Sequence, residues 1–281
     1  EVGKVDFLVK KIQKNSGEKF NGTTGIAHTR WATHGGVTEM NAHPHTAGDG
    51  KLVLVHNGIV ENYRELKKEL KDQNFESETD SEILAKLIYQ NYDGKLENSL
   101  LKAVKKTLPM VRGTYGLVVM HADHPGELVA ARLGSPLAIG IGNNEYFIAS
   151  DVTPMLPFTK QVKFLEDGEV AHMTLAGLKI FNLRDELINK NSVQIDWSKE
   201  KAQKNGYENF MLKEIFDQPA VFEDAIRGRI LMQEGTAHLG GLAMTPEEMR
   251  KINRIVLIAC GTAHHSCMIA KYAFERLSGI P

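Results

Sequence analysis

Three short motifs between residues 28 and 58 hold most of the side chains that could do chemistry. They are HTRWATHG at residues 28–35, NAHPH at 41–45 and HNG at 56–58. Together they supply an arginine, a tryptophan, hydroxyl groups, histidines and glycines. Such a mixture suits a hydrophobic core poorly, but it suits a pocket that binds a small zwitterion. The motifs therefore predict a binding site of that kind.

Arg30 is the candidate for the carboxylate end of such a ligand. A guanidinium group can donate two parallel hydrogen bonds to the α-carboxylate of an amino acid. Taken alone, an arginine more often forms a surface ion pair. The neighbours favour binding, because Thr33 and His34 add donors and the glycines at 35–36 let the backbone move. Trp31 beside these glycines is typical of a lid, and a half-buried structural tryptophan is the alternative.

Asp80 and the pair Asn57-Gly58 each allow two interpretations. Asp80 can complement the dipole at the start of a helix, or it can hold a substrate ammonium group, and one acid can do both. Asn57-Gly58 has the sequence of a two-residue hairpin turn. In the other interpretation, the Asn57 amide and the Gly58 N–H form an oxyanion hole, where loss of one donor raises the barrier by about 3 kcal/mol. The sequence leaves both pairs of alternatives open.

The histidines of these motifs do not predict a metal site. No HExxH helix or cysteine pair accompanies them, and the two rings of His43-Pro44-His45 are placed awkwardly for one ion. Near the other end of the chain, Gly261-Thr262 follows an apolar segment. Backbone N–H groups and hydroxyls at the start of a helix bind phosphate, although a plain strand-to-helix turn is equally compatible.

Length and composition narrow the class of protein. The 281 residues are enough for one large domain, or for one domain and part of a second. The net charge of −1 gives no basic field for nucleic acid or an anionic membrane. No apolar stretch approaches the ~20 residues of a membrane span, and residues 1–14 do not resemble a signal peptide. Two cysteines, Cys260 and Cys267, are too few for a disulfide framework, which favours a cytoplasmic protein.

The hydrophobic pattern predicts an α+β domain with sheets packed together and helices outside. Helices are expected over 63–71, from Thr79 onward and over 99–108. The expected strands are 25–27, 52–55, 117–120, 128–131, 137–141, 146–149 and 175–181.

Composition changes after Ile195. Residues 196–206 are polar and lysine-rich, which is typical of a linker. Helical patterns follow at 207–217, 220–231 and 246–253, then a buried strand over 254–260 and a helix from about 264 to 277. The chain therefore predicts the beginning of a second, α/β unit after the linker.

Taken in order, these motifs resemble those of the class II glutamine amidotransferases, and among them the isomerising glutamine–fructose-6-phosphate aminotransferases. The resemblance covers nearly the whole chain. Each motif is weak alone, and their common order makes the resemblance specific. Besides those above, the motifs are SETD at 77–80, RGTYG at 112–116, GSPL at 134–137, FIASD at 147–151, KEI at 213–215, QP at 218–219 and ACGT at 259–262.

The resemblance implies a fold and a set of domains. Residues 1–197 are expected to form an N-terminal-nucleophile glutaminase domain, a four-layer αββα sandwich. A linker over 198–206 and the first part of a sugar isomerase (SIS) domain over 207–281 would follow. In this family a first-residue cysteine attacks the glutamine amide, with its own α-amine as the base. That cysteine would lie upstream of Glu1, so residues 1–281 alone are expected to hydrolyse no glutamine.

The resemblance also implies a role for each candidate residue. Asn57 and Gly58 would form the oxyanion hole, Trp31 would gate the passage of ammonia, and Thr262 would contact sugar phosphate. Ala263 stands where some members have serine. The residues that would bind glutamine are Arg30, Thr33 and His34 at the α-carboxylate and Asp80 with Gly58 at the α-ammonium.

The implied substrates are glutamine and fructose 6-phosphate, with ammonia transferred to give glucosamine 6-phosphate. No cofactor, metal, nucleic acid or membrane partner is expected, and the full-length protein would be a homo-oligomer. Two alternatives stay open. Another class II enzyme, such as an amidophosphoribosyltransferase, would carry a phosphoribosyltransferase motif where residues 259–262 favour SIS. A glutamine-binding module without turnover would lack a cysteine in the upstream coding sequence.

Overall fold

The computed structural model describes residues 2–14, 22–30, 35–70, 74–94, 97–195, 207–227, 229–231, 235–237 and 244–281. The chain separates into two compact units, Glu1–Gln203 and Lys204–Pro281, here called unit 1 and unit 2. The expected linker over 198–206 lies outside the described residues.

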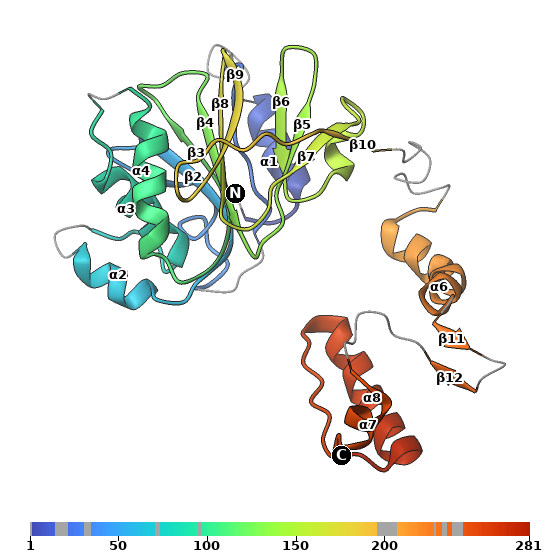
Figure 1. Cartoon of the computed structure of the whole chain (residues 1–281). Helices are drawn as coiled ribbons and strands as arrows, with labels where there is room; N and C mark the ends of the chain where they lie inside the picture. Colours follow the sequence, from blue (N-terminus) through green and yellow to red (C-terminus); the bar gives the residue numbers. More distant parts are fainter. Residues whose placement is uncertain are drawn as a thin grey trace. The chain divides into compact units, whose positions relative to one another are not determined.

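A six-stranded antiparallel sheet is the centre of unit 1 (Figure 1). Its strands run in the order β1-β2-β3-β4-β8-β9. The longest pairing joins β2 to β3, from Leu52 opposite His121 to Val60 opposite Gly113. The bounds are β1 His45–Ala47, β2 Leu52–Val60, β3 Gly113–His121, β4 Leu128–Leu133, β8 Glu169–Thr174 and β9 Gly177–Asn182.

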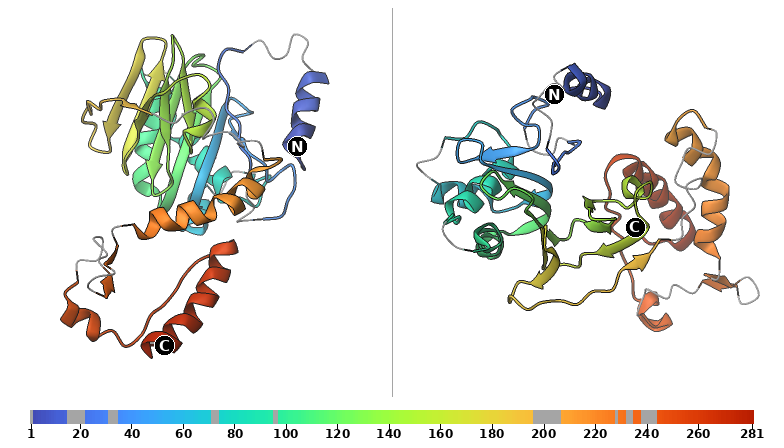
Figure 2. Two further views of the ribbon diagram at one scale, coloured as in Figure 1. Left: turned by 90° about the vertical axis from the view of Figure 1, so that its right-hand side faces the viewer. Right: turned by 90° about the horizontal axis from the view of Figure 1, so that it is seen from above.

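A second antiparallel sheet has four strands in the order β10-β7-β5-β6. The helices α3 and α4 cover one face of the six-stranded sheet, and the four-stranded sheet lies over the other face (Figures 1 and 2). The bounds are β5 Ala138–Ile141, β6 Tyr146–Ala149, β7 Gln161–Phe164, β10 Val193–Gln194, α2 Tyr63–Glu69, α3 Asp80–Gln90, α4 Ser99–Thr107 and the 3-10 helices η2 Leu108–Met110 and η3 Thr153–Met155.

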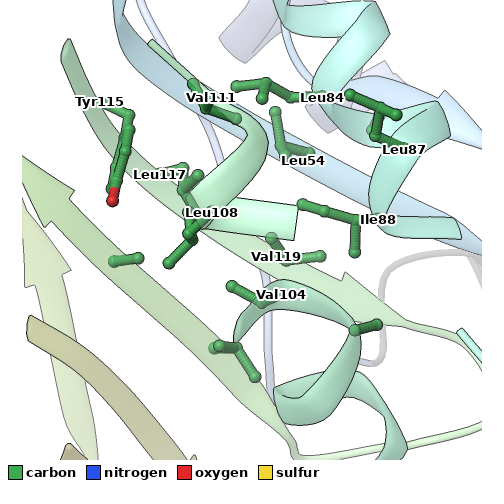
Figure 3. Close-up of a cluster of buried hydrophobic side chains, with 14 of the residues drawn as sticks. Leu54, Leu84, Leu87, Ile88, Val104, Leu108, Val111, Tyr115, Leu117 and Val119 are labelled. Atoms are coloured by element: carbon green, nitrogen blue, oxygen red, sulfur yellow. The ribbon is translucent and has the colours of Figure 1, made fainter. Parts of the chain in front are cut away.

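The central strands are buried on both faces because successive side chains point to opposite sides of a sheet. Leu54 and Leu117 pack with Leu84, Ile88 and other residues of α3 and α4 (Figure 3). The next residues along, including Val55 and Val118, instead pack in the core between the two sheets. This arrangement explains why β2 and β3 read as continuous apolar runs.

The predicted α+β class with antiparallel sheets is confirmed. The expected strand over 25–27 is wrong: these residues form no strand and pair with none of the described strands. The strands expected over 137–141 and 146–149 form, but they belong to the second sheet. Helix α1, Val5–Lys14, has no buried residue.

Unit 2 differs from its prediction in two places. The helix α6, Phe210–Ile226, is continuous through Pro219, whereas two helices were expected. One proline removes a single helical hydrogen bond, and the turns on either side keep theirs. The remaining elements are β11 Ile230–Leu231, β12 Thr236–Ala237, α7 Pro246–Arg250 and α8 Gly261–Ser278.

The expected buried strand over 254–260 is also wrong. Residues 252–260 have no strand structure, and Val256 and Ile258 are 65% and 88% exposed. A buried strand needs neighbouring strands to satisfy its backbone and cover its side chains. The described residues of unit 2 provide none beside this segment.

Candidate functional site

A cavity of about 160 Å³ brings four of the predicted residues together in unit 1. It lies where residues 28–30, the middle of β2 and the start of α3 meet. Arg30, Asn57, Gly58 and Asp80 all line it. Hollows of about 460 and 770 Å³ lie elsewhere in unit 1, and none of these four residues lines either of them. We therefore take the smaller cavity as the candidate site, because the predicted residues line it.

The pair Asn57-Gly58 lies inside β2 and does not form a turn. Asn57 pairs with Gly116, and Gly58 pairs with Tyr115, so the hairpin interpretation is wrong. Gly58 has φ +140°, and a Cβ there would lie 2.1 Å from the Thr114 carbonyl oxygen. Only glycine fits this position. The local Asn-Gly signal was misleading because long-range pairing with β3 decides the backbone path.

Asp80 is the first residue of α3 and is only 4% exposed. Its Oδ2 accepts a hydrogen bond of 2.7 Å from the Val60 backbone N–H. Thr79 caps the helix by accepting from the Glu82 N–H. The position of Asp80 is compatible with both interpretations. It lies at a helix N-terminus, where a negative charge is favourable, and it lines the cavity.

The Arg30 side chain is hydrogen-bonded to the segment that begins at residue 35. Its guanidinium donates to the Gly36 carbonyl oxygen at 2.8 Å. The side chain of Asn41 donates to the same oxygen at 3.0 Å, and Glu78 Oε2 accepts from the Gly36 N–H at 3.1 Å. A further bond of 3.0 Å joins Asn41 Nδ2 to Glu78 Oε2. We call Gly36, Asn41 and Glu78 the Arg30 clamp.

The sequence did not single out Asn41 or Glu78, although both fall in motifs that carried the resemblance. Hydrogen bonds from Gly36 and Asn41 lower the pKa of the Glu78 carboxyl group, and the nearby Arg30 charge adds to this effect. Spacing could not reveal their role, because they lie 37 residues apart. The remaining predicted residues of the first motif, Trp31, Thr33 and His34, lie outside the described residues.

Two buried histidines connect the strands to the start of α3. His56 Nε2 lies 3.3 Å from the Thr114 carbonyl oxygen, and its Nδ1 lies 2.8 Å from Ser81 Oγ. The carbonyl can only accept, so Nε2 carries the proton and Nδ1 accepts from the serine. His45 Nε2 lies 2.9 Å from Thr79 Oγ1. Both histidines therefore connect a strand of the sheet to the start of α3, beside the cavity.

Burial keeps these rings neutral. Desolvation lowers the pKa of His56, and it lowers that of His45 to about 4 despite the neighbouring carboxylates Glu82 and Asp80. The pKa of His43 falls to about 2, also mainly through burial. No group of three or more His, Cys, Asp or Glu within the described ranges is arranged to hold a metal ion.

Thr262 lies in unit 2, in the first turn of α8, and is exposed. The helix begins at Gly261, three residues before the expected start. Gly261 has φ +60°, a conformation that glycine adopts readily. In the described part of the chain, no helix is both long and apolar enough to span a bilayer.

Comparisons with known proteins find similarity in the region around this cavity. Residues 28–157 match the family model of the glutamine amidotransferase domain. All the residues that line the cavity fall within this matched region. A solved structure of glutamine phosphoribosylpyrophosphate amidotransferase from B. subtilis is 27% identical, with a TM-score of 0.45 over 57% of this chain and 35% of its own.

The particular relatives are glutamine–fructose-6-phosphate aminotransferases (isomerizing). A protein of that name from Thermus thermophilus is 46% identical over 99% of this chain, and that from Chlorobaculum tepidum is 42% identical over 99%. The resemblance found in the motifs is therefore confirmed: the chain is related to these aminotransferases along nearly all of its length. It spans 44% and 46% of the length of these two relatives.

Proposed function

We propose that this chain is the glutaminase half and the beginning of the isomerase half of an enzyme that releases ammonia from glutamine. The ammonia would be transferred to fructose 6-phosphate to give glucosamine 6-phosphate. The similarity to the named aminotransferases supports this reaction. The observation that carries the proposal is the gathering of Arg30, Asp80, Asn57 and Gly58 around one cavity.

The cavity offers a complementary group for each part of glutamine. Arg30 would donate to the α-carboxylate, and the buried Asp80 carboxylate would hold the α-ammonium group, with Gly58 beside it. The side-chain amide would then lie near Asn57 and Gly58. Thr33 and His34 are proposed to add carboxylate contacts, and Trp31 to gate ammonia.

The chemistry would follow the N-terminal-nucleophile scheme that the resemblance implies. The thiolate of a first-residue cysteine attacks the amide carbon, and negative charge develops on the carbonyl oxygen. Asn57 and Gly58 would stabilise that charge. The carbon–nitrogen bond then breaks, ammonia leaves with the proton taken from the thiol, and water hydrolyses the thioester to glutamate.

The finer organisation is part of the same proposal. Residues 1–197 would form the four-layer αββα glutaminase domain, residues 198–206 a linker and residues 207–281 the first part of the SIS domain. Thr262 at the start of α8 would contact the sugar phosphate. The full-length protein would be a cytoplasmic homo-oligomer.

Titration of L-glutamine into the chain by calorimetry tests the binding half of this proposal. Arg30→Ala should abolish most of the binding heat while changing the thermal midpoint little, because the carboxylate loses its main partner. The matched control is Arg64→Ala, which removes an exposed arginine of α2. If Arg30→Ala loses stability and binding in parallel, Arg30 is a structural residue and the proposed role fails.

A further inference from the structure

We propose that His28 is a positioning residue, which holds the Asn57 carboxamide so that its NH2 group faces the cavity. This inference rests on the proposed function, because it explains how the oxyanion hole is set before substrate binds. It is carried by one contact: His28 Nε2 lies 2.6 Å from Asn57 Oδ1.

The contact decides which end of the Asn57 amide is available. A carboxamide has an acceptor oxygen and a donor nitrogen on opposite sides of its terminal carbon. An amide oxygen turned to the cavity would repel a developing oxyanion, whereas the NH2 group would stabilise it. Because His28 occupies the oxygen, the nitrogen is left for the cavity that Asn57 lines.

The same contact selects the tautomer of His28. Because Asn57 Oδ1 accepts the hydrogen bond, Nε2 of His28 must carry the proton. In this tautomer Nδ1 has a lone pair and no proton. Nδ1 is buried and has no hydrogen-bond partner among the residues that the structure describes. A proton on Nδ1 would therefore be an unsatisfied buried donor, and Nε2 and Oδ1 would then face each other as two acceptors.

A row of rings holds His28 in this orientation. The centroids of the His43 and His28 rings are 4.2 Å apart, and the two ring planes are tilted by 35°. His43 in turn meets His45 edge to face at 4.7 Å, and His45 contacts the helix-capping Thr79. Burial lowers the pKa of His43 to about 2, so no charge on this neighbour opposes the donor role of His28. The orientation of Asn57 is thereby linked to the start of α3.

A double-mutant cycle in the full-length enzyme tests the proposal. Asn57→Ala is expected to lower kcat for glutamine hydrolysis by roughly 10²–10³-fold and to change KM little. His28→Ala is expected to lower kcat at least about ten-fold, again with little change in KM. In the Asn57→Ala background, His28→Ala should have no further effect, because its target is gone.

Two conservative variants sharpen the test. The glutamine of His28→Gln places an NH2 group near the position of Nε2, so it should restore much of the kcat lost in His28→Ala. The asparagine of His28→Asn places its NH2 group near the position of Nδ1 and should restore little. Equal kcat values for these two variants would overturn the proposal, as would additive losses in the double mutant.

The tautomer gives a readout that does not depend on activity or on any variant. In the unsubstituted chain, 15N NMR of labelled histidine should show His28 with its proton on Nε2. A proton on Nδ1 would refute the inference even if all His28 variants fail to fold. If Asn57→Ala keeps the kcat of the unsubstituted enzyme, the oxyanion role within the proposed function fails instead. The two failures are therefore distinguishable.

Discussion

Two clusters of histidines lie at opposite ends of α3 and β3. The site cluster, His28, His43, His45 and His56, surrounds the start of α3. The distal cluster, His121, His124 and His172, lies near the end of β3, beyond the last turn of α3. Sequence composition does not separate them, because both are dense in histidine and aromatic or hydroxyl neighbours.

Their position relative to the cavity separates them. In the distal cluster, His124 Nε2 contacts Tyr92 Oη at 2.7 Å and Ser99 Oγ at 3.1 Å. Glu127 belongs to the same group of side chains. Its Oε1 lies 2.8 Å from His172 Nε2, and its Oε2 lies 3.3 Å from His124 Nδ1. These histidines therefore bind groups of the protein itself. In the site cluster, His28, His43 and His56 line the cavity. His28 also contacts Asn57, and His56 contacts Ser81, and both of these partners line the same cavity. A sequence rich in histidine predicts a polar cluster. The site cluster is a candidate site because three of its histidines also line a cavity.

The largest expected effect comes from filling the space beside the site cluster. Gly58→Ala would place a methyl group 2.1 Å from the Thr114 oxygen and 2.9 Å from His56 Nε2. The free energy of unfolding should fall by about 3–5 kcal/mol, with loss of glutamine binding. Urea unfolding and calorimetry would measure both.

The control for this variant lies beside the distal cluster. Gly126 also has a positive φ, of +79°, but the new methyl group of Gly126→Ala would meet only Leu175 at 3.5 Å. This substitution should cost about 1–2 kcal/mol and leave glutamine affinity unchanged. Equal losses in the two variants would show that Gly58 is needed only for its backbone angle.

The pH dependence of stability tests whether the site cluster must stay neutral. The pKa of His45 is about 4 in the folded state, below its usual 6.5, so acid protonates the unfolded chain first. Its contribution is fully present above pH 6.5 and is lost as the pH falls toward 4, at up to about 1.4 kcal/mol per pH unit.

His45→Gln isolates this contribution, because glutamine keeps a polar group near Thr79 and does not titrate. Urea unfolding at pH 8 and pH 5 should show a smaller loss of stability on acidification in the variant than in the unsubstituted chain. If the two chains lose the same stability, His45 is not held neutral by the fold.

The smallest expected effect comes from the Arg30 clamp. Glu78→Gln weakens the acceptor that holds the Gly36 N–H and removes a negative charge near Arg30. Glutamine affinity should fall roughly two- to five-fold, as is usual for exposed charged contacts. Calorimetry at two salt concentrations would measure it. The control is Glu65→Gln on α2, where the carboxylate has an exposed partner in Arg112. This variant should leave glutamine affinity unchanged. An equal loss of affinity in both variants would show that the effect comes from net charge and not from the Arg30 clamp.

The sequence predicted the local features of the site better than its assembly. The capping Thr79 and the helix that follows it depend on neighbouring residues, and they were predicted correctly. The path of β2 through Asn57-Gly58 depends on pairing with β3, more than fifty residues away, and local turn chemistry pointed elsewhere.

The same limit applies to the roles of particular side chains. The contact between His28 and Asn57 crosses 29 residues, and that between Asn41 and Glu78 crosses 37. No spacing rule links such pairs. In unit 2, apolar residues 255–259 predicted a buried strand because periodicity records hydrophobicity alone. It carries no information about whether a partner strand lies beside the segment.

The proposed function depends most on the binding of the two ends of one amino acid by Arg30 and Asp80. Calorimetric titration of Asp80→Asn with L-glutamine and with glutaramic acid, which is glutamine without its amino group, tests this directly. Asparagine keeps an oxygen for the Val60 N–H, so the fold should survive. We predict that the variant binds glutamine far more weakly than the unsubstituted chain but binds glutaramic acid equally well. Equal losses for both ligands would contradict the assignment of Asp80 to the ammonium group.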